Sequence, residues 1–238
     1  MITIPVAFPW TLFTPPVFRY LPTRYADEFF ESGLLRLSSF RRFHQHTDEQ
    51  RFDANEGNAI LVHRNSEGTG QTAYVVASGG RNAYVLCGSM RHDAELMKAF
   101  EADSYIRIND PTAFATAVAR HVPGLNAGAE GPCLYQEERS VLRDLGPLDF
   151  SGFGPGNTST PSGPVIEITN PSPEQKAQIE KLFREPFGLY PLFLKHKTFA
   201  HQSEYRLIWL TSADAEGFLD IRAPEAIQFC SRPTIITE

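Results

Sequence analysis

The stretch Phe193-Leu-Lys-His-Lys-Thr-Phe-Ala-His-Gln-Ser-Glu-Tyr-Arg-Leu-Ile-Trp-Leu210 joins a polar loop to an apolar segment. The segment from Tyr205 to Leu210 is β-prone with one Arg inside, which predicts a core strand. A carboxylate at the point where a loop enters a rigid strand is partly desolvated and firmly held, as many catalytic carboxylates are. Glu204 is therefore a candidate catalytic residue. The alternative is that Glu204 pairs with a nearby Arg or Lys at a sheet edge.

Composition limits the class of protein. The 238 residues suffice for one large domain or two small ones, and 42% of them are hydrophobic. A net charge of −6 gives no general affinity for nucleic acid, although a local basic patch stays open. Cys87, Cys133 and Cys230 are far apart and lack CxxC spacing, so we expect a reducing, cytoplasmic location. Apolar runs fall short of the roughly 20 residues of a spanning helix, so we expect no membrane partner.

The order of predicted elements indicates an α+β fold. Residues 1–16 are Pro-rich and aromatic, and we expect them to form an arm before one domain over residues 17–238. A strand over 17–21, a helix over 25–31 and a strand over 34–38 open this domain, with Thr23 as N-cap and Gly33 as C-cap of the helix. Further strands are expected at 59–63, 72–76, 82–89, 104–108, 132–137, 205–210, 217–221 and 227–230.

Three more helices follow from capping signals and apolar spacing. They are expected over 92–100, after Asp110, and over 173–183 behind Ser172. The 59–63 and 72–76 strands form a hairpin, because the residues between them are turn formers. Residues 145–164 are rich in Gly, Pro, Ser and Thr and predict an exposed, flexible loop. Without regular βαβ alternation, about ten short strands and four helices are typical of α+β proteins.

Common catalytic and metal-binding patterns are weak in this sequence. His44 with His46 and His196 with His201 do not match common ligand spacings, so surface histidines are expected and no metal. Gly88-Ser-Met-Arg lacks the second glycine of a nucleophile elbow. The three glycines of residues 151–156 do not open a helix after a strand, so a dinucleotide fingerprint is missing.

Three short elements, in order, resemble the ADP-ribosyltransferase superfamily. They are Arg19 on the first strand, Ser38-Ser39 at the end of the next, and Gln202-x-Glu204 at the start of a late strand. The chain departs from the superfamily by having Ser-Ser where Ser-Thr-Ser is usual, and Tyr20 is an alternative to Arg19. The resemblance implies split mixed or antiparallel sheets flanked by short helices. It also implies that NAD is consumed as a substrate.

The resemblance assigns a role to each of these residues. Arg19 would clamp the NAD phosphates, because a guanidinium suits a pyrophosphate. Glu204 would be catalytic, since a carboxylate stabilises a developing positive charge. The remaining roles are a nicotinamide pocket from Ser38 or Ser39 with Tyr20 or Tyr25 stacking on the ring, and acceptor binding by Gln202, Phe199, Lys195 and Lys197. We therefore expect Arg19 and Glu204 to face each other across a cleft that holds NAD.

A second resemblance covers most of the chain. Gly-Leu-Leu-Arg-Leu-Ser-Ser39, Tyr-Val-Leu-Cys-Gly-Ser89 and Phe193-Leu-Lys-His-Lys-x-Phe with Glu204-Tyr-Arg-Leu are similar to a bacterial domain family of unknown function. Members carry a late Lys…Glu-x-Glu-Tyr-Arg signature, in which Gln202 here replaces the first Glu. The resemblance implies a bacterial or phage source and a place among accessory or defence genes. A toxin or phage-defence effector with a macromolecular acceptor, and with an antitoxin or defence partner protein, would fit.

Two other functions stay open at this stage. Asp48, Asp53 and Glu56, together with Glu204, could hold Mg²⁺ in a nuclease or other hydrolase, with Lys195 or Lys197 steadying a phosphate. Alternatively, the chain is a non-catalytic immunity or adaptor module that binds through its aromatic N-terminal arm.

Overall fold

The computed structural model describes residues 15–43, 56–64, 72–143, 158–160, 163–165, 172–179, 181 and 188–233. Contacts divide the chain into two compact units, where we expected one domain. Unit 1 consists of residues 1–42, 82–132 and 201–238, and unit 2 consists of residues 43–81 and 133–200. The fold is α+β, with a mainly antiparallel sheet and short helices.

The sheet of unit 1 is centred on β5 (Ala83–Ser89). Along one edge β5 pairs antiparallel with β13 (Glu204–Thr211), which pairs in turn with β7 (Leu125–Pro132). Along the other edge β5 has two partners, β1 (Val17–Leu21) at Ser89 and β2 (Leu34–Ser39) at Val85 and Tyr84. The sheet therefore forks beside β5. We call β1 and β2, with the strands that they carry, the two branches.

Each branch continues outward by antiparallel pairing. The β1 branch continues with β6 (Ser104–Ile108) and then β15 (Cys230–Ser231). The β2 branch continues with β14 (Phe218–Arg222), the last strand of the described sheet on that side. A single helix, α1 (Thr23–Ser32), connects β1 to β2. Both branches therefore arise from one short β-α-β segment.

Both ends of α1 are fixed by contacts. The predicted capping role of Thr23 is wrong: α1 has no side-chain N-cap, and Thr23 instead donates from its backbone N–H and its hydroxyl to Asp103. These two bonds lower the pKa of Asp103. At the other end Gly33 is the predicted C-cap, with φ +71° and its N–H bonded to Phe29. A Cβ on Gly33 would lie 2.4 Å from Pro224 N. This position therefore requires a residue without a side chain for steric reasons as well.

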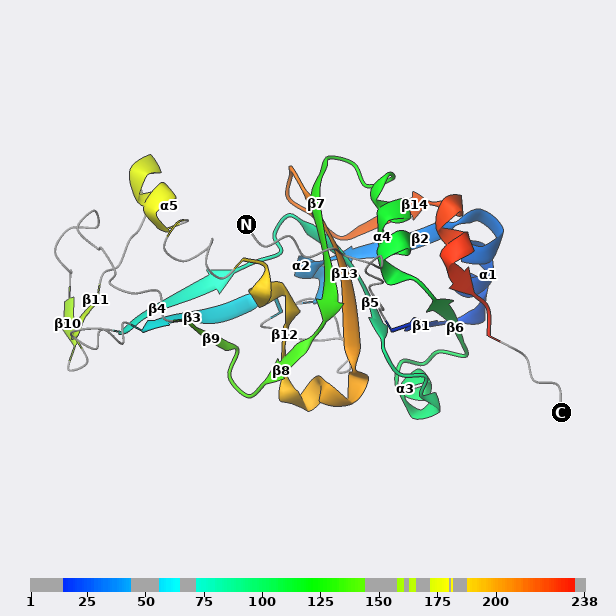
Figure 1. Cartoon of the computed structure of the whole chain (residues 1–238), viewed down its shortest axis with the longest axis horizontal. Helices are drawn as coiled ribbons and strands as arrows, with labels where there is room; N and C mark the ends of the chain where they lie inside the picture. The colour runs from blue at the N-terminus through cyan, green and yellow to red at the C-terminus, as the bar shows by residue number, and fades with distance from the viewer. Residues whose placement is uncertain are drawn as a thin grey trace, which may run out of the picture. The chain divides into compact units, whose positions relative to one another are not determined.

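Helices cover one face of the forked sheet, which we call the helix face. In Figure 1, α1, α4 (Pro111–Ala119) and the C-terminal turn η5 (Pro224–Phe229) lie together on this side. The core there includes Phe29, Leu86, Phe114, Leu207 and Trp209. Because side chains alternate along a strand, the residues between these core positions point to the opposite face, which we call the far face.

Unit 2 is built mainly from short strands. β3 (Asn58–Arg64) pairs antiparallel with β4 (Thr72–Ser78), as the predicted hairpin requires, and parallel with β9 (Ser140–Arg143). β12 (Leu194–His196), which follows η3 (Tyr190–Phe193), pairs parallel with β8 (Leu134–Gln136). The 3-10 helix η4 (Lys197–Gln202) begins in unit 2, and its last two residues belong to unit 1. Unit 2 is thus assembled from two separate excursions of the chain.

The remaining elements are short. α2 (Phe40–Phe43) follows β2, and α3 (Ala94–Ala99) is capped by Asp93, whose carboxylate accepts from two backbone N–H groups. Asp110 caps α4, as predicted, and its carboxylate accepts from Ala113 N–H at 2.9 Å. Ser172 caps α5 (Pro173–Ile179): its hydroxyl accepts from Gln175 N–H, and its own N–H donates to Gln175 Oε1. Of the described helices, none is long and apolar enough to cross a membrane.

Several predicted elements are corrected by the structure. Residues 227–230, predicted as a strand, lie mainly in the 3-10 helix η5, and strand β15 is limited to Cys230–Ser231. Strands β7 and β9 were not predicted. Within the predicted loop at 145–164, the described part holds a small hairpin of β10 (Thr158–Thr160) and β11 (Gly163–Val165). The rest of that loop, and residues 1–14 of the arm predicted over 1–16, lie outside the described residues.

Candidate functional site

A row of three buried polar side chains spans the end of η4, at Gln202, and the start of β13, at Glu204 and Arg206. Gln202, Glu204 and Arg206 are 3%, 6% and 1% exposed, respectively. Between the first two, Ser203 has a φ of +44°, a conformation that L-residues rarely adopt. The carbonyl of Ser203 accepts from Met90 N–H at 2.9 Å, which ties this strained residue to the end of β5. Backbone strain beside buried polar groups is a frequent property of functional sites.

Glu204 and Arg206 form a buried ion pair. Arg206 Nε donates to Glu204 Oε1 at 2.6 Å, and the Arg206 guanidinium lies over the Phe40 ring with 5.7 Å to the centroid. The two residues are two positions apart on a strand, so their side chains leave the same face. A buried pair of this kind is weak evidence for stability, because desolvation offsets most of the attraction. The alternative weighed for Glu204 was an ion pair with an Arg or Lys at a sheet edge. The ion pair, with Arg206, is observed, but β13 lies between β5 and β7 and not at an edge.

The register of the strands shows which other residues share the face of Glu204. Glu204 lies opposite Ser89 on β5, and Ser89 lies opposite Phe18 on β1. Directly paired residues of antiparallel strands point to the same side of a sheet. Glu204, Ser89 and Phe18 therefore form one line across three strands of the far face, and Phe18 is two strand spacings, roughly 10 Å, from Glu204.

Arg19 does not join this line. It follows Phe18 on β1 and pairs with the core residue Ile106. Its side chain therefore projects from the helix face of the sheet. Its guanidinium donates to the carbonyl of Cys87 on β5 at 3.2 Å and to the carbonyl of Arg36 on β2 at 3.3 Å. The expectation that Arg19 and Glu204 face each other across a cleft is therefore wrong. Arg19 supplies hydrogen bonds where the β1 and β2 ladders separate.

The other predicted cofactor-binding residues divide between the two faces. Tyr20 pairs with Tyr105 and Ser38 with Val85, and both lie on the far face with Glu204. Ser39 pairs with Tyr84 on the helix face, where its buried hydroxyl has no hydrogen-bond partner. Tyr25 lies on α1, which packs against the helix face, and is 42% exposed. The structure therefore brings Tyr20 and Ser38, but not Ser39 or Tyr25, to the face of Glu204.

Tyr20 is held by its hydroxyl and by its ring. The hydroxyl donates to the carbonyl of Arg91 and accepts from Asp93 N–H, both at 2.7 Å. Its ring meets Tyr105 edge-on, and Tyr105 in turn meets Phe18 edge-on at a centroid distance of 5.6 Å. Burial raises the pKa of Tyr20 above its ordinary value. Phe18, Tyr20 and Tyr105 thus form a half-buried aromatic group on the far face of the β1 branch.

The predicted acceptor-binding residues of the loop belong to unit 2. Lys195 is 6% exposed, and its ammonium lies over the Phe199 ring at 4.8 Å from the centroid. Lys197 is exposed and forms an ion pair with Glu137. Of the acids considered for a magnesium site, Glu56 is buried in unit 2 and Glu204 is in unit 1, whereas Asp48 and Asp53 lie outside the described residues. Among the described residues, no group of three or more His, Cys, Asp or Glu side chains could hold a metal ion.

Sequence reasoning missed Arg206, Ser89 and Phe18. Arg206 carried a usable signal, because a charge two residues after Glu204 in a predicted strand must share its face. The roles of Ser89 and Phe18 depend on register, which a single strand does not reveal. Comparison of the chain with protein-family models, with curated proteins and with solved structures finds no match.

Proposed function

We propose that the far face of unit 1 at the start of β13 is an active site that cleaves the glycosidic bond of NAD and transfers ADP-ribose to an acceptor. The observation that carries the proposal is the buried row of Gln202, Glu204 and Arg206, with the strained Ser203 between the first two. The forked sheet, with separate branches on one edge of β5, is compatible with the split sheets of an ADP-ribosyltransferase-like fold. Arg19 has no role in this site.

The chemistry requires a fixed negative charge. When the bond between ribose C1′ and the nicotinamide nitrogen breaks, the electron pair leaves with nicotinamide, and C1′ gains oxocarbenium character. The acceptor then attacks C1′ and loses a proton. A carboxylate that is positioned before the reaction stabilises this developing positive charge. Arg206 Nε donates to Glu204 Oε1 at 2.6 Å and helps to hold this carboxylate in place.

The aromatic group on the β1 branch supports the same proposal. Phe18 lies on the far face at roughly 10 Å from Glu204, a separation that leaves room for a flat ring beside the ribose. Tyr20, which we expected to stack on nicotinamide, shares this face. Aromatic faces bind planar rings by offset stacking, with ring centroids about 4.5–7 Å apart. Phe18, with Tyr20 behind it, would therefore hold the nicotinamide end of the dinucleotide.

The direct test is release of nicotinamide from NAD by the purified full chain. Glu204→Gln keeps a hydrogen-bonding group for Arg206 but removes the charge, and we expect it to lower the rate roughly 100-fold or more. Glu225→Gln is a matched control, because Glu225 is also ion-paired, with His121, but lies on η5 at the helix face. That variant should keep the wild-type rate.

Three results would separate the alternatives. Turnover of NAD that is insensitive to Glu204→Gln, in a variant whose circular dichroism is unchanged, would remove Glu204 from the site. A magnesium-dependent hydrolysis lost with both Glu56→Ala and Glu204→Ala would favour the hydrolase. Absence of any nicotinamide release by the wild-type chain, with water or a cell extract as acceptor, would overturn the transferase proposal.

A further inference from the structure

The line of paired residues that begins at Glu204 ends at an arginine. Glu204 lies opposite Ser89, and Ser89 lies opposite Phe18. Phe18 lies in turn opposite Arg107 on β6, so the side chain of Arg107 also leaves the far face. Arg107 is three strand spacings, roughly 14 Å, from Glu204. One row across four strands therefore has a carboxylate at one end and a guanidinium at the other.

The charge of Arg107 is not compensated by its surroundings. The side chain is exposed, and its guanidinium carbon lies 6.0 Å from the Phe18 ring centroid. Its neighbour on the other side is Ser231 of β15, and among the described residues no carboxylate forms an ion pair with it. The acids nearest in sequence are engaged elsewhere, because Asp110 caps α4 and Asp103 accepts two bonds from the start of α1. Arg107 can therefore donate to an external anion.

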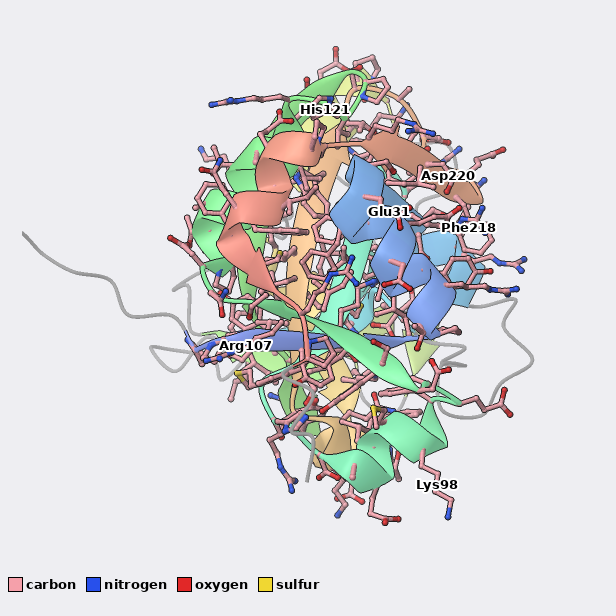
Figure 2. All side chains as sticks on the ribbon, turned by 90° about the vertical axis from the view of Figure 1, so that its right-hand side faces the viewer. Glu31, Lys98, Arg107, His121, Phe218 and Asp220 are labelled. Atoms are coloured by element: carbon pink, nitrogen blue, oxygen red, sulfur yellow. The ribbon has the colours of Figure 1, made fainter. Side chains whose placement is uncertain are left out.

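Position distinguishes Arg107 from other arginines of the far face. Arg36 donates to both carboxylate oxygens of Asp220, at 2.7 and 2.8 Å. Figure 2 shows Asp220 at one side of unit 1 and Arg107 at the opposite side. Arg222 is exposed on the far face too, but it lies on β14, the outermost described strand of the β2 branch. Arg107 is on the β1 branch and in the same row as Glu204.

We infer that Arg107 binds a phosphate of the substrate and makes the proposed site selective for nicotinamide compounds that carry one. This inference rests on the proposed function. A guanidinium donates paired N–H bonds to phosphate oxygens. The phosphates of NAD are joined to the nicotinamide ribose through its C5′ methylene group. With the ribose at Glu204 and the nicotinamide at Phe18, they can extend along the same row to Arg107.

The overall charge of the chain makes such a local cation necessary. A net charge of −6 gives an anionic dinucleotide no long-range attraction, so a nearby positive group must supply it. Arg19, which we expected to clamp the phosphates, projects from the helix face and donates to two backbone carbonyls. Arg107 places a guanidinium on the face of Glu204, where Arg19 does not.

The test compares nicotinamide release by the full chain from NAD and from nicotinamide riboside, which has no phosphate. Arg107→Ala should lower kcat/KM for NAD about 10- to 100-fold, as expected for the loss of a charge-assisted hydrogen bond. It should leave kcat/KM for nicotinamide riboside unchanged, and Arg107→Lys should recover part of the loss with NAD. The matched control is Arg222→Ala, which removes an exposed far-face arginine from the other branch. This variant should behave like the wild type with both substrates.

Calorimetric titration with ADP-ribose measures the same contact without turnover. ADP-ribose carries the two phosphates but no nicotinamide, and Arg107→Ala should weaken its binding about tenfold or more. Thermal unfolding identifies any misfolded variant, and Arg107→Gln then replaces Arg107→Ala.

The outcomes separate this inference from the transferase proposal. Equal losses with NAD and nicotinamide riboside, or unchanged turnover of NAD by Arg107→Ala, would overturn the inference and leave the transferase standing. If the wild-type chain releases no nicotinamide, the transferase proposal fails and the titration decides the role of Arg107. Binding of ADP-ribose that depends on Arg107 would then support the phosphate site, whereas absence of binding, or equal binding by Arg107→Ala, would overturn it.

Discussion

Arg206 Nε lies 2.6 Å from Glu204 Oε1, with side chains only 1% and 8% exposed, so β13 carries a largely buried salt bridge. Removing one partner leaves the other charge buried and unpaired. We expect Glu204→Ala or Arg206→Ala to lower the free energy of unfolding by about 3–5 kcal/mol. Urea denaturation measures this directly.

The double replacement of this pair distinguishes charge from packing. Glu204→Leu with Arg206→Met should recover much of the stability lost by either single variant, because apolar groups of similar volume need no pairing. Recovery of stability without recovery of nicotinamide release would show that the ion pair is kept for activity. If the single variants are as stable as the wild type, then removing one partner does not leave the other charge buried and unpaired, and the prediction is wrong.

We expect Arg19 to stabilise the fork of the sheet and not to bind a ligand. Arg19→Met removes the donors to Cys87 and Arg36 and should reduce the free energy of unfolding by about 1–3 kcal/mol. Arg19→Lys should retain part of that stability, since one ammonium replaces a guanidinium that reaches both carbonyls. Nicotinamide release per folded molecule should not change. A large loss of activity at unchanged stability would return Arg19 to the cofactor site.

Tyr205 gives the protein a stability limit at high pH. Its side chain is 4% exposed on the helix face, and burial, reinforced by the charge of Glu130, raises its pKa to about 12. In the unfolded chain the phenol ionises near pH 10. The stabilisation is thus complete below pH 10 and is lost as pH rises through 12, by up to about 2–3 kcal/mol. Urea titrations from pH 9 to 12 should show this loss, and Tyr205→Phe should reduce it.

Gly33 and Gly217 form a matched pair for testing the end of α1. Both have positive φ, at +71° and +57°, so an alanine is strained at either position by about 1 kcal/mol. At Gly217 an added Cβ meets nothing within 4 Å, whereas at Gly33 it meets Pro224 N at 2.4 Å. Gly33→Ala should therefore destabilise the protein clearly more than Gly217→Ala. Equal melting temperatures would show that η5 moves aside freely.

Local signals predicted much of the fold. The β1-α1-β2 segment, the β3–β4 hairpin and strand β13 follow from apolar patterns and from Gly33. Strand β7 was missed because Leu-Asn-Ala-Gly-Ala-Glu-Gly-Pro132 has little β-propensity, and pairing with β13 imposes its conformation. The strand predicted over 227–230 was wrong for the opposite reason. This apolar run has β-propensity, but tertiary contacts hold most of it as a 3-10 helix.

The candidate site was predictable in type but not in arrangement. Glu204, Gln202 and Tyr20 were identified from their positions in the chain, and the structure places Glu204 and Tyr20 on one face. The opposite placement of Arg19 results from a one-residue shift relative to Phe18, and one residue reverses the face of a strand. The sequence of β1 alone does not indicate which of its two faces the helices cover.

The two excursions that form unit 2 have a practical consequence for protein production. β3 and β9, which pair with each other, come from different excursions, and β5 to β7 of unit 1 are encoded between them. Both ends of the chain belong to unit 1, so a conventional truncation at either end removes residues of unit 1 first and cannot separate the two units. Isolating unit 1 requires two internal splices, from residue 42 to 82 and from 132 to 201, and the complementary fragment needs a linker from 81 to 133.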